Sequence, residues 1–156
     1  MIQIYGKGGH ARMIASLLKG PVSFFDDQDY HKADARASWI IGVGNNEDRQ
    51  KIAKKLGQAQ FTNALSGLAV QTSDIGVGVV ISLGAVVQGD VKIGNHVIIN
   101  TSASIDHDCQ IGDFCHIAPN ATLCGTVSVG SGSFIGAGSV ISVSYTHLTL
   151  PTTPYV

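Results

Sequence analysis

Residues 93–117 read IGNHVIINTSASIDHDCQIGDFCHI, and an isoleucine returns at every sixth position of this stretch. The same spacing continues in both directions without an interruption. The positions that share it are all aliphatic: Ile75, Ile81, Val87, Ile93, Ile99, Ile105, Ile111, Ile117, Leu123, Val129, Ile135 and Ile141. Chance does not produce such a run in a chain of which 44% is hydrophobic. A repeating unit of six residues therefore decides the fold of this region.

A second column of mostly small or β-branched residues precedes each aliphatic residue by two positions: Val79, Ala85, Val91, Val97, Ala103, Cys109, Cys115, Ala121, Val127, Ser133 and Ser139. Residues two apart in a strand share a face, so both columns are expected to point inward. Glycine often follows the aliphatic residue, as at Gly94 and Gly112, and glycine suits a sharp turn every six residues. Three turns close a triangle, and the pattern resembles the hexapeptide-repeat, left-handed parallel β-helix. We predict this fold for residues 66–143, with Cys109 and Cys115 in its core.

Residues 1–65 lack the sixfold period and alternate between strand-like and helix-like segments. The expected elements are a strand at Ile2–Tyr5, a helix at Ala11–Lys19, strands at Val22–Phe25 and Trp39–Val43, a helix at Glu47–Leu56, and a short strand near Phe61. This order predicts an α/β, Rossmann-like βαβαβ domain in front of the β-helix.

A glycine-rich segment, Gly6-Lys7-Gly8-Gly9-His10-Ala11, stands between the first strand and the first helix. It fits the G-x-G-x-x-A pattern, in which backbone N–H groups approach a phosphate at a helix N-terminus. Asp26 and Asp27 end the second strand, where a ribose-binding acid is expected. A tight turn without a ligand is the alternative interpretation. A nicotinamide cofactor is disfavoured, because half a Rossmann fold is too small to hold both nucleotides.

The motifs of both regions occur together in one known family. They are Tyr5-Gly-Lys-Gly-Gly-His10-Ala11, Phe24-Phe25-Asp26-Asp27, Gly44-Asn45-Asn46-x-x-Arg49, Ile105-Asp-His107-Asp108-Cys, Asp113-Phe-Cys-His116 and Leu123-Cys-Gly125. Over about residues 1–143 the chain resembles the bacterial sugar acetyltransferases typified by the sialic acid O-acetyltransferase and the UDP-4-amino-sugar N-acetyltransferase.

This resemblance implies that acetyl-CoA is the co-substrate and that His107 is the general base, with Asp108 at the family's acidic position. It also implies that Gly125 and His116 contact the thioester of acetyl-CoA. Spacing alone leaves open whether Asp106 or Asp108 reaches the imidazole, because adjacent strand residues point to opposite faces. The coil length of 18 residues places Gly89 and Gly125 on either side of His107, which predicts a groove of bare backbone beside the ring.

The resemblance further implies a nucleotide-sugar site in the front domain, built by Gly8, Gly9, His10, Asp26, Asp27 and Asn45. The connection between Asp27 and Trp39 is short, a feature that resembles the N-acetyltransferases acting on UDP-4-amino-4,6-dideoxy sugars. This resemblance favours N-acetylation over O-acetylation of a sialic acid or related sugar. Because the catalytic groups of this fold class usually converge from two subunits, a homotrimer is implied.

Composition and charge exclude several other classes. A net charge of −1 gives no reason to expect a nucleic acid or an acidic membrane surface as a partner. Strand-like sequence begins at Ile2, with neither a signal-peptide pattern nor a membrane span, so we expect a cytoplasmic protein. The three cysteines lack metal-site spacing and are expected to be reduced. No metal is predicted. His31, His96 and His147 belong to no motif and are expected at the surface.

The sixfold register stops after Ile141, and residues 144–156 contain two prolines but no glycine. We interpret residues 144–156 as an out-of-pattern, non-native tail and exclude them from the fold. Two other function classes stay open at this point: a non-catalytic hexapeptide-repeat scaffold and a nicotinamide-dependent enzyme.

Overall fold

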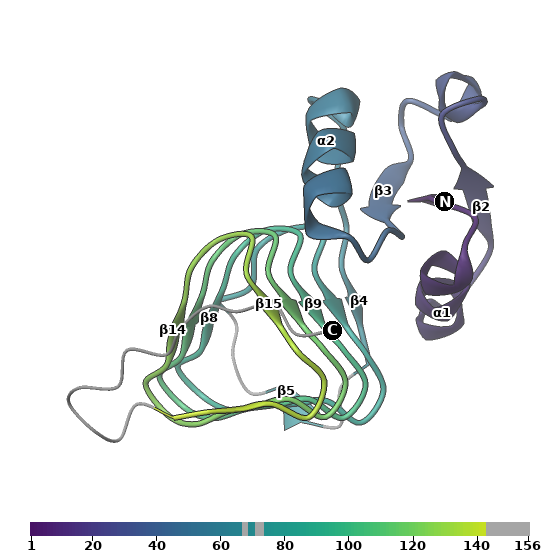
Figure 1. Ribbon diagram of the computed structural model, residues 1–156. Coiled ribbons are helices and arrows are strands. Elements are labelled where there is room, and N and C mark those ends of the chain that lie inside the picture. Colours follow the sequence, from purple (N-terminus) through teal and green to yellow (C-terminus); the bar gives the residue numbers. More distant parts are fainter. Residues whose placement is uncertain (67–68, 71–73, 143–156) are drawn as a thin grey trace.

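The computed structural model describes residues 1–66, 69–70 and 74–142 (Figure 1). A small front domain leans against one side of a stack of three-sided coils. The expected tail at 144–156 lies outside the described residues. No helix among the residues described is long and apolar enough to span a membrane.

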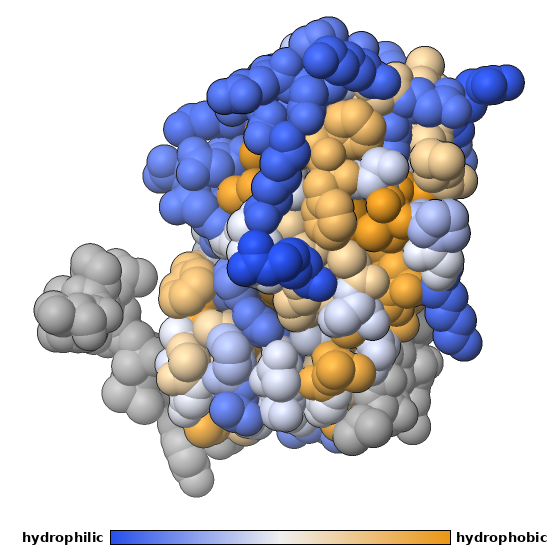
Figure 2. Space-filling model, turned by 90° about the vertical axis from the view of Figure 1, so that its right-hand side faces the viewer, coloured by the Kyte–Doolittle hydropathy of each residue, from blue (hydrophilic) through white to orange (hydrophobic). Residues whose placement is uncertain are grey.

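The front domain contains a parallel three-stranded sheet with the order β2-β1-β3. Its elements are β1 (Ile2–Tyr5), α1 (Gly9–Leu17), β2 (Val22–Phe25), a 3-10 helix at Tyr30–Lys32, β3 (Ser38–Ile41) and α2 (Asn46–Leu56). The predicted parallel β/α arrangement is confirmed. The segment near Phe61 makes only an isolated bridge to Trp39. Figure 2 shows the molecule from the right-hand side of Figure 1, and apolar side chains gather in the middle of this face.

The remaining strands are each two residues long and form three parallel sheets. The sheet that faces the front domain is called the front-facing sheet. It contains β4 (Ala64–Leu65), β6 (Val80–Ile81), β9 (Ile98–Ile99), β12 (His116–Ile117) and β15 (Phe134–Ile135). The lower sheet contains β5 (Ala69–Val70), β7 (Val86–Val87), β10 (Ser104–Ile105), β13 (Thr122–Leu123) and β16 (Val140–Ile141). The far sheet contains β8 (Lys92–Ile93), β11 (Gln110–Ile111) and β14 (Ser128–Val129).

Successive coils pair with an offset of 18 residues, as in the pairing of Ile105 with Leu123. The predicted β-helix is therefore confirmed. Both sequence columns line its interior: Cys109, Cys115 and Leu123 are all 0% exposed, and they belong to one continuous core. The expected packing of the two cysteines is thus confirmed. The domain boundary at residue 65 stays a prediction, and β4 already pairs with β6 of the β-helix.

The sharp turns fall at a different hexad position from the one expected. Every sixth residue from Gly78 to Gly138 adopts a positive φ, and the non-glycine members, among them His96 and Asp108, have φ between 55° and 66°. The glycines that follow the aliphatic residues serve another purpose. A Cβ at Gly94 would lie 2.7 Å from the backbone N of Asp113 in the next coil. Gly76, Gly94 and Gly112 are therefore needed where two coils approach closely, and the left-handed turns lie two residues later.

The front domain and the β-helix share one core. Ile4, Ala11 and Ile14 of the front domain pack with Val80 and Ile98 on the outer face of the front-facing sheet. Helix α1 thereby covers the early coils of this sheet, and the N-terminal end of α2 reaches the later ones.

Candidate active site

His107 lies in the turn between the lower sheet and the far sheet. We call residues 106–109 and 124–127, which form two stacked turns, the His107 corner. The His107 side chain is 61% exposed, and its Nδ1 lies 2.7 Å from Oδ2 of Asp108. Asp106 instead accepts a hydrogen bond of 2.9 Å from Gln88 Nε2. The alternative left open by the sequence is thus resolved: Asp108 contacts the imidazole of His107.

The contact with Asp108 defines which imidazole nitrogen is available for chemistry. A carboxylate accepts hydrogen bonds, so His107 donates from Nδ1 and Nε2 keeps its lone pair. This Nε2 lies against Gly125 of the next coil: a Cβ at Gly125 would be 2.8 Å from Nε2 and 2.7 Å from Cε1. The ring thus leans toward Gly125, whereas no heavy atom of the described residues lies within 4 Å of a Cβ placed on Gly89. Bare backbone at Gly125 leaves Nε2 accessible to a substrate.

His116 occupies a different part of the molecule, on β12 of the front-facing sheet. It is only 8% exposed, and burial lowers its pKa. Its Nδ1 donates to the carbonyl oxygen of Gly44 at 3.1 Å, and its Nε2 accepts from Asn100 Nδ2 at 3.2 Å. The ring borders a cavity of about 470 Å³ that Phe134 and the start of α2 also line. Within one chain His116 and Gly125 therefore stand on different sides of the β-helix.

The glycine turn leads directly into helix α1. Gly8 is the N-cap and provides no side-chain cap, and no heavy atom of the described residues lies within 4 Å of a Cβ placed on Gly8. The first amides of α1 therefore face a region into which an anionic group can fit. His10 follows on this helix with its ring 6.3 Å from that of His116. Its Nε2 is buried and has no hydrogen-bond partner among the described residues, and burial lowers the pKa of His10 to about 4.

Two ion-paired clusters surround the paired aspartates. Lys7 Nζ lies 2.9 Å from Asp26 and 2.8 Å from Asp29. Asp27 accepts a hydrogen bond of 2.5 Å from the hydroxyl of Tyr5 and forms an ion pair with Lys55, which lowers the pKa of the Asp27 carboxyl. Both aspartates line a cavity of about 480 Å³.

Asn45 is the N-cap of α2 and accepts a 3.0 Å hydrogen bond from the amide of Asp48. It borders the cavity beside His116 rather than the one beside the aspartates. The structure therefore distributes the predicted substrate-binding residues over two neighbouring cavities and the helix N-terminus between them.

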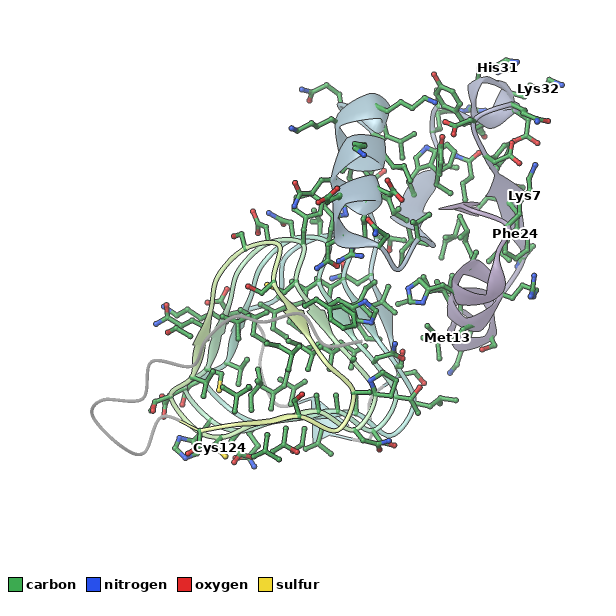
Figure 3. All side chains as sticks on the ribbon, in the orientation of Figure 1. Lys7, Met13, Phe24, His31, Lys32 and Cys124 are labelled. Atoms are coloured by element: carbon green, nitrogen blue, oxygen red, sulfur yellow. The ribbon has the colours of Figure 1, made fainter. Side chains whose placement is uncertain are left out.

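The His107 corner and the front domain lie on opposite sides of the β-helix. Figure 3 places Cys124, the neighbour of Gly125, at the lower left of the molecule, whereas Lys7 of the glycine turn lies at the upper right. The front domain packs on the front-facing sheet, which is the side of the triangle opposite this corner.

Sequence reasoning missed the burial of two residues where the front domain meets the β-helix. His96 was expected at the surface, which is wrong: it is 5% exposed, stacked on Phe114 with ring centroids 4.9 Å apart, and in edge contact with Phe61. Arg49 is 1% exposed and bonds to both domains. Its place in the quoted motif was the available signal. His31 is exposed as expected, and His147 lies outside the described residues.

Comparison with known proteins supports the repeat assignment. Residues 108–142 match the family model described as bacterial transferase hexapeptide (six repeats). Within the part of the chain that the structure describes, no group of three or more His, Cys, Asp or Glu residues is arranged to hold a metal ion.

Several solved structures are similar to this chain over both of its domains. The acetyltransferase domain of PglB from Neisseria gonorrhoeae FA1090 is 26% identical, with a TM-score of 0.76 and 90% of each chain covered, and it is also known in complex with acetyl coenzyme A. Perosamine N-acetyltransferase from Caulobacter crescentus, in complex with CoA and GDP-perosamine, is 24% identical, with a TM-score of 0.74 and 90% and 88% covered. WeeI from Acinetobacter baumannii AYE is 22% identical, with a TM-score of 0.79 and 91% and 80% covered. The predicted resemblance to sugar acetyltransferases of the hexapeptide-repeat class is confirmed.

Proposed function

We propose that this chain is an acetyl-CoA-dependent N-acetyltransferase that acts on a nucleotide-linked amino sugar. The observation that carries the proposal is the His107 corner, where an exposed imidazole is held by Asp108 and its free nitrogen lies against the bare backbone of Gly125. The similarity to the PglB domain, which is known with acetyl coenzyme A, and to a perosamine N-acetyltransferase known with a nucleotide sugar supports the same chemistry.

His107 acts as the general base. Its Nε2 takes a proton from the acceptor amine as the amine nitrogen attacks the thioester carbonyl of acetyl-CoA. The C–S bond then breaks, and the imidazolium returns its proton to the departing thiolate of CoA. Asp108 holds the Nδ1–H tautomer and stabilises the imidazolium while it exists.

Two further groups are assigned to acetyl-CoA. The N–H of Gly125 stands beside the base nitrogen and is suited to donate to the oxyanion that develops on the thioester carbonyl. His116 is assigned as a second contact for the co-substrate. Because its Nδ1 and Nε2 are already bonded within the chain, His116 reaches the thioester only if Asn100 releases Nε2.

The nucleotide sugar is assigned to the front domain. The uncapped start of α1 at Gly8 and Gly9 suits the diphosphate, and His10 stands beside it with an unpartnered Nε2. Asp26 and Asp27 offer carboxylate oxygens to hydroxyl or N–H groups of the nucleoside, and Asn45 lies at the border of the neighbouring cavity. We favour a UDP-4-amino-4,6-dideoxy sugar as the acceptor. O-acetylation of a sialic acid or related sugar is the alternative.

The placement of these two parts supports the homotrimer that the family resemblance implies. A sugar held by the front domain of one chain faces away from the His107 corner of the same chain, because the β-helix lies between them. The corner of a neighbouring copy can supply His107 and Gly125 instead. We therefore propose that each active site forms between two copies in a closed ring of three.

Release of the CoA thiol, measured over a panel of UDP- and GDP-linked amino sugars and sialic acids, tests this function. We expect turnover with a nucleotide-linked amino sugar, and a loss of about 10²- to 10⁴-fold in kcat for His107→Ala. Because His107 is 61% exposed, the variant should retain its melting temperature. Turnover with sialic acid alone would replace the N-acetylation proposal with O-acetylation. Equal behaviour of wild type and His107→Ala would favour a non-catalytic scaffold.

A further inference from the structure

Arg49, on the second turn of α2, is the most extensively bonded side chain between the two domains. It is 1% exposed, and burial lowers its pKa to about 10, so it stays charged at neutral pH. Its six hydrogen bonds to the described residues all go to neutral oxygens, five of them backbone carbonyls and one an amide. A buried cation solvated by backbone in this way holds those carbonyls in one arrangement.

The bonds of Arg49 divide between the two domains. On the front-domain side, Nη1 donates to the carbonyls of Val43 and Gly44 at 3.2 and 2.9 Å. On the β-helix side, Nε donates to the carbonyl of His96 at 2.9 Å, and Nη2 donates to that of Phe114 at 2.9 Å. His96 and Phe114 occupy the same place in successive coils, 18 residues apart. The rigid, planar guanidinium thus spans two coils and one loop at once.

Asn46 extends the same contact to a third coil. Its Nδ2 donates to the carbonyls of Gly132 and Ser133 at 2.9 and 3.0 Å, while its Oδ1 accepts from Arg49 at 2.8 Å. His116, in the same coil as Phe114, donates a further hydrogen bond to the carbonyl of Gly44. The carbonyl of Gly44 therefore receives hydrogen bonds from two directions, one from each domain. We call Arg49, Asn46 and these carbonyls the latch.

We infer that Arg49 is a positioning residue, which fixes the Gly44–Asn45 loop on the β-helix and thereby sets where the front domain presents its nucleotide sugar. This inference rests on the proposed function. The loop borders the cavity beside His116, and the salt bridges found among the described front-domain residues all join two residues of that domain. Since the acceptor amine must meet His107 of another copy, a small rotation of the front domain moves the amine out of attack distance.

Arg49→Lys separates positioning from simple packing. Lysine keeps the charge but cannot span two coils and a loop with a single ammonium group. We expect kcat to fall by about 10- to 100-fold, whereas the Kd of acetyl-CoA, which binds the β-helix, stays within about twofold. Hydrogen exchange of amides 43–46 should become faster, and that of the coils around Leu123 should not change. Arg36→Lys is the matched control, because Arg36 lies in the same domain with a side chain that is 93% exposed.

Asn46→Ala provides a second variant if Arg49→Lys melts below the assay temperature. It removes the two bonds to the third coil and the acceptor of one Arg49 bond, but leaves the five bonds of Arg49 to backbone carbonyls in place, so we expect the same pattern with a smaller loss of kcat. The inference is overturned if exchange of amides 43–46 is unchanged, or if the Kd of acetyl-CoA weakens in proportion to kcat. A wild-type chain that transfers no acetyl group to any sugar would overturn the proposed function instead, and the exchange measurement would still decide the role of Arg49.

Discussion

The His107 corner and the latch region use histidine in opposite ways. At the corner, His107 is 61% exposed and bonds to the carboxylate of its neighbour Asp108. We use the term latch region for the latch together with three histidines around it, His10, His96 and His116. These histidines lie near the buried charge of Arg49, and burial lowers the pKa of each. An exposed imidazole that bonds to a carboxylate can gain and lose a proton during a reaction. A buried imidazole beside a guanidinium stays neutral and serves packing and hydrogen bonding.

Substitution of Gly125 should break the corner without disturbing the latch. In Gly125→Ala the new methyl group would lie 2.7 Å from Cε1 of His107, so the exposed ring must turn away from its place beside the backbone. We expect kcat for acetyl transfer to fall by about 10- to 100-fold with an unchanged melting temperature. Gly130→Ala is the control, because its methyl group would lie 3.9 Å from the nearest heavy atom of the described residues, Oγ of Ser133. Equal activity of the two variants would show that the ring position at Gly125 is irrelevant.

Acid should weaken the latch region and spare the corner. Burial, with a smaller contribution from the charge of Arg49, lowers the pKa of His96 from 6.5 to about 4. As the pH falls below 6.5 the unfolded chain binds a proton that the folded chain does not, so the stability present above that pH is lost progressively toward pH 4. Between pH 7.5 and 5.0 this one residue should remove about 2 kcal/mol from the free energy of unfolding.

Urea unfolding of His96→Asn at both pH values isolates this contribution. Asparagine tolerates the left-handed backbone found at His96 and does not titrate. The loss on acidification should therefore be smaller in the variant than in wild type by about 2 kcal/mol. His31→Asn, at an exposed histidine, should lose as much as wild type does. An identical acid loss in His96→Asn would show that His96 does not titrate differently on folding.

The two regions also differ in how far the sequence predicts them. The β-helix core follows from a period of six. Residues 18 apart pack against each other in successive coils, regardless of which residues lie on the outer surface. The contact of Asp108 with His107 was one of two alternatives, and the left-handed backbone at Asp108, with φ of 60°, decides between them. Burial of His96 was not predictable from local pattern, because it depends on Phe61 and Arg49 of the other domain. Contacts between the two domains follow no sequence period, so the motif around Arg49 was the only sequence feature that pointed to residues of this interface.

The reactivity of the three cysteines compares the His107 corner with the interior of the β-helix, and measuring it perturbs the molecule least. Cys109 and Cys115 are 0% exposed, burial raises the pKa of each thiol, and each Sγ donates to a backbone carbonyl. Cys124 is half-buried beside Gly125. We expect a thiol reagent such as dithionitrobenzoate to label one cysteine rapidly at pH 8, and the other two at least about 100-fold more slowly, because they react only when the coils open.

Cys124→Ser should abolish the fast phase of labelling, whereas Cys109→Ser should leave it intact. Rapid reaction of two or three thiols would mean that the coils around Leu123 open readily in solution, and a groove built on them could not hold His107 against Gly125. A single fast thiol, placed beside the base, would instead show that the interior is closed while the corner is open. The proposed chemistry needs a closed interior and an open corner at once. The closed interior holds His107 in one place, and the backbone without a side chain at Gly125 leaves Nε2 of His107 accessible to a substrate.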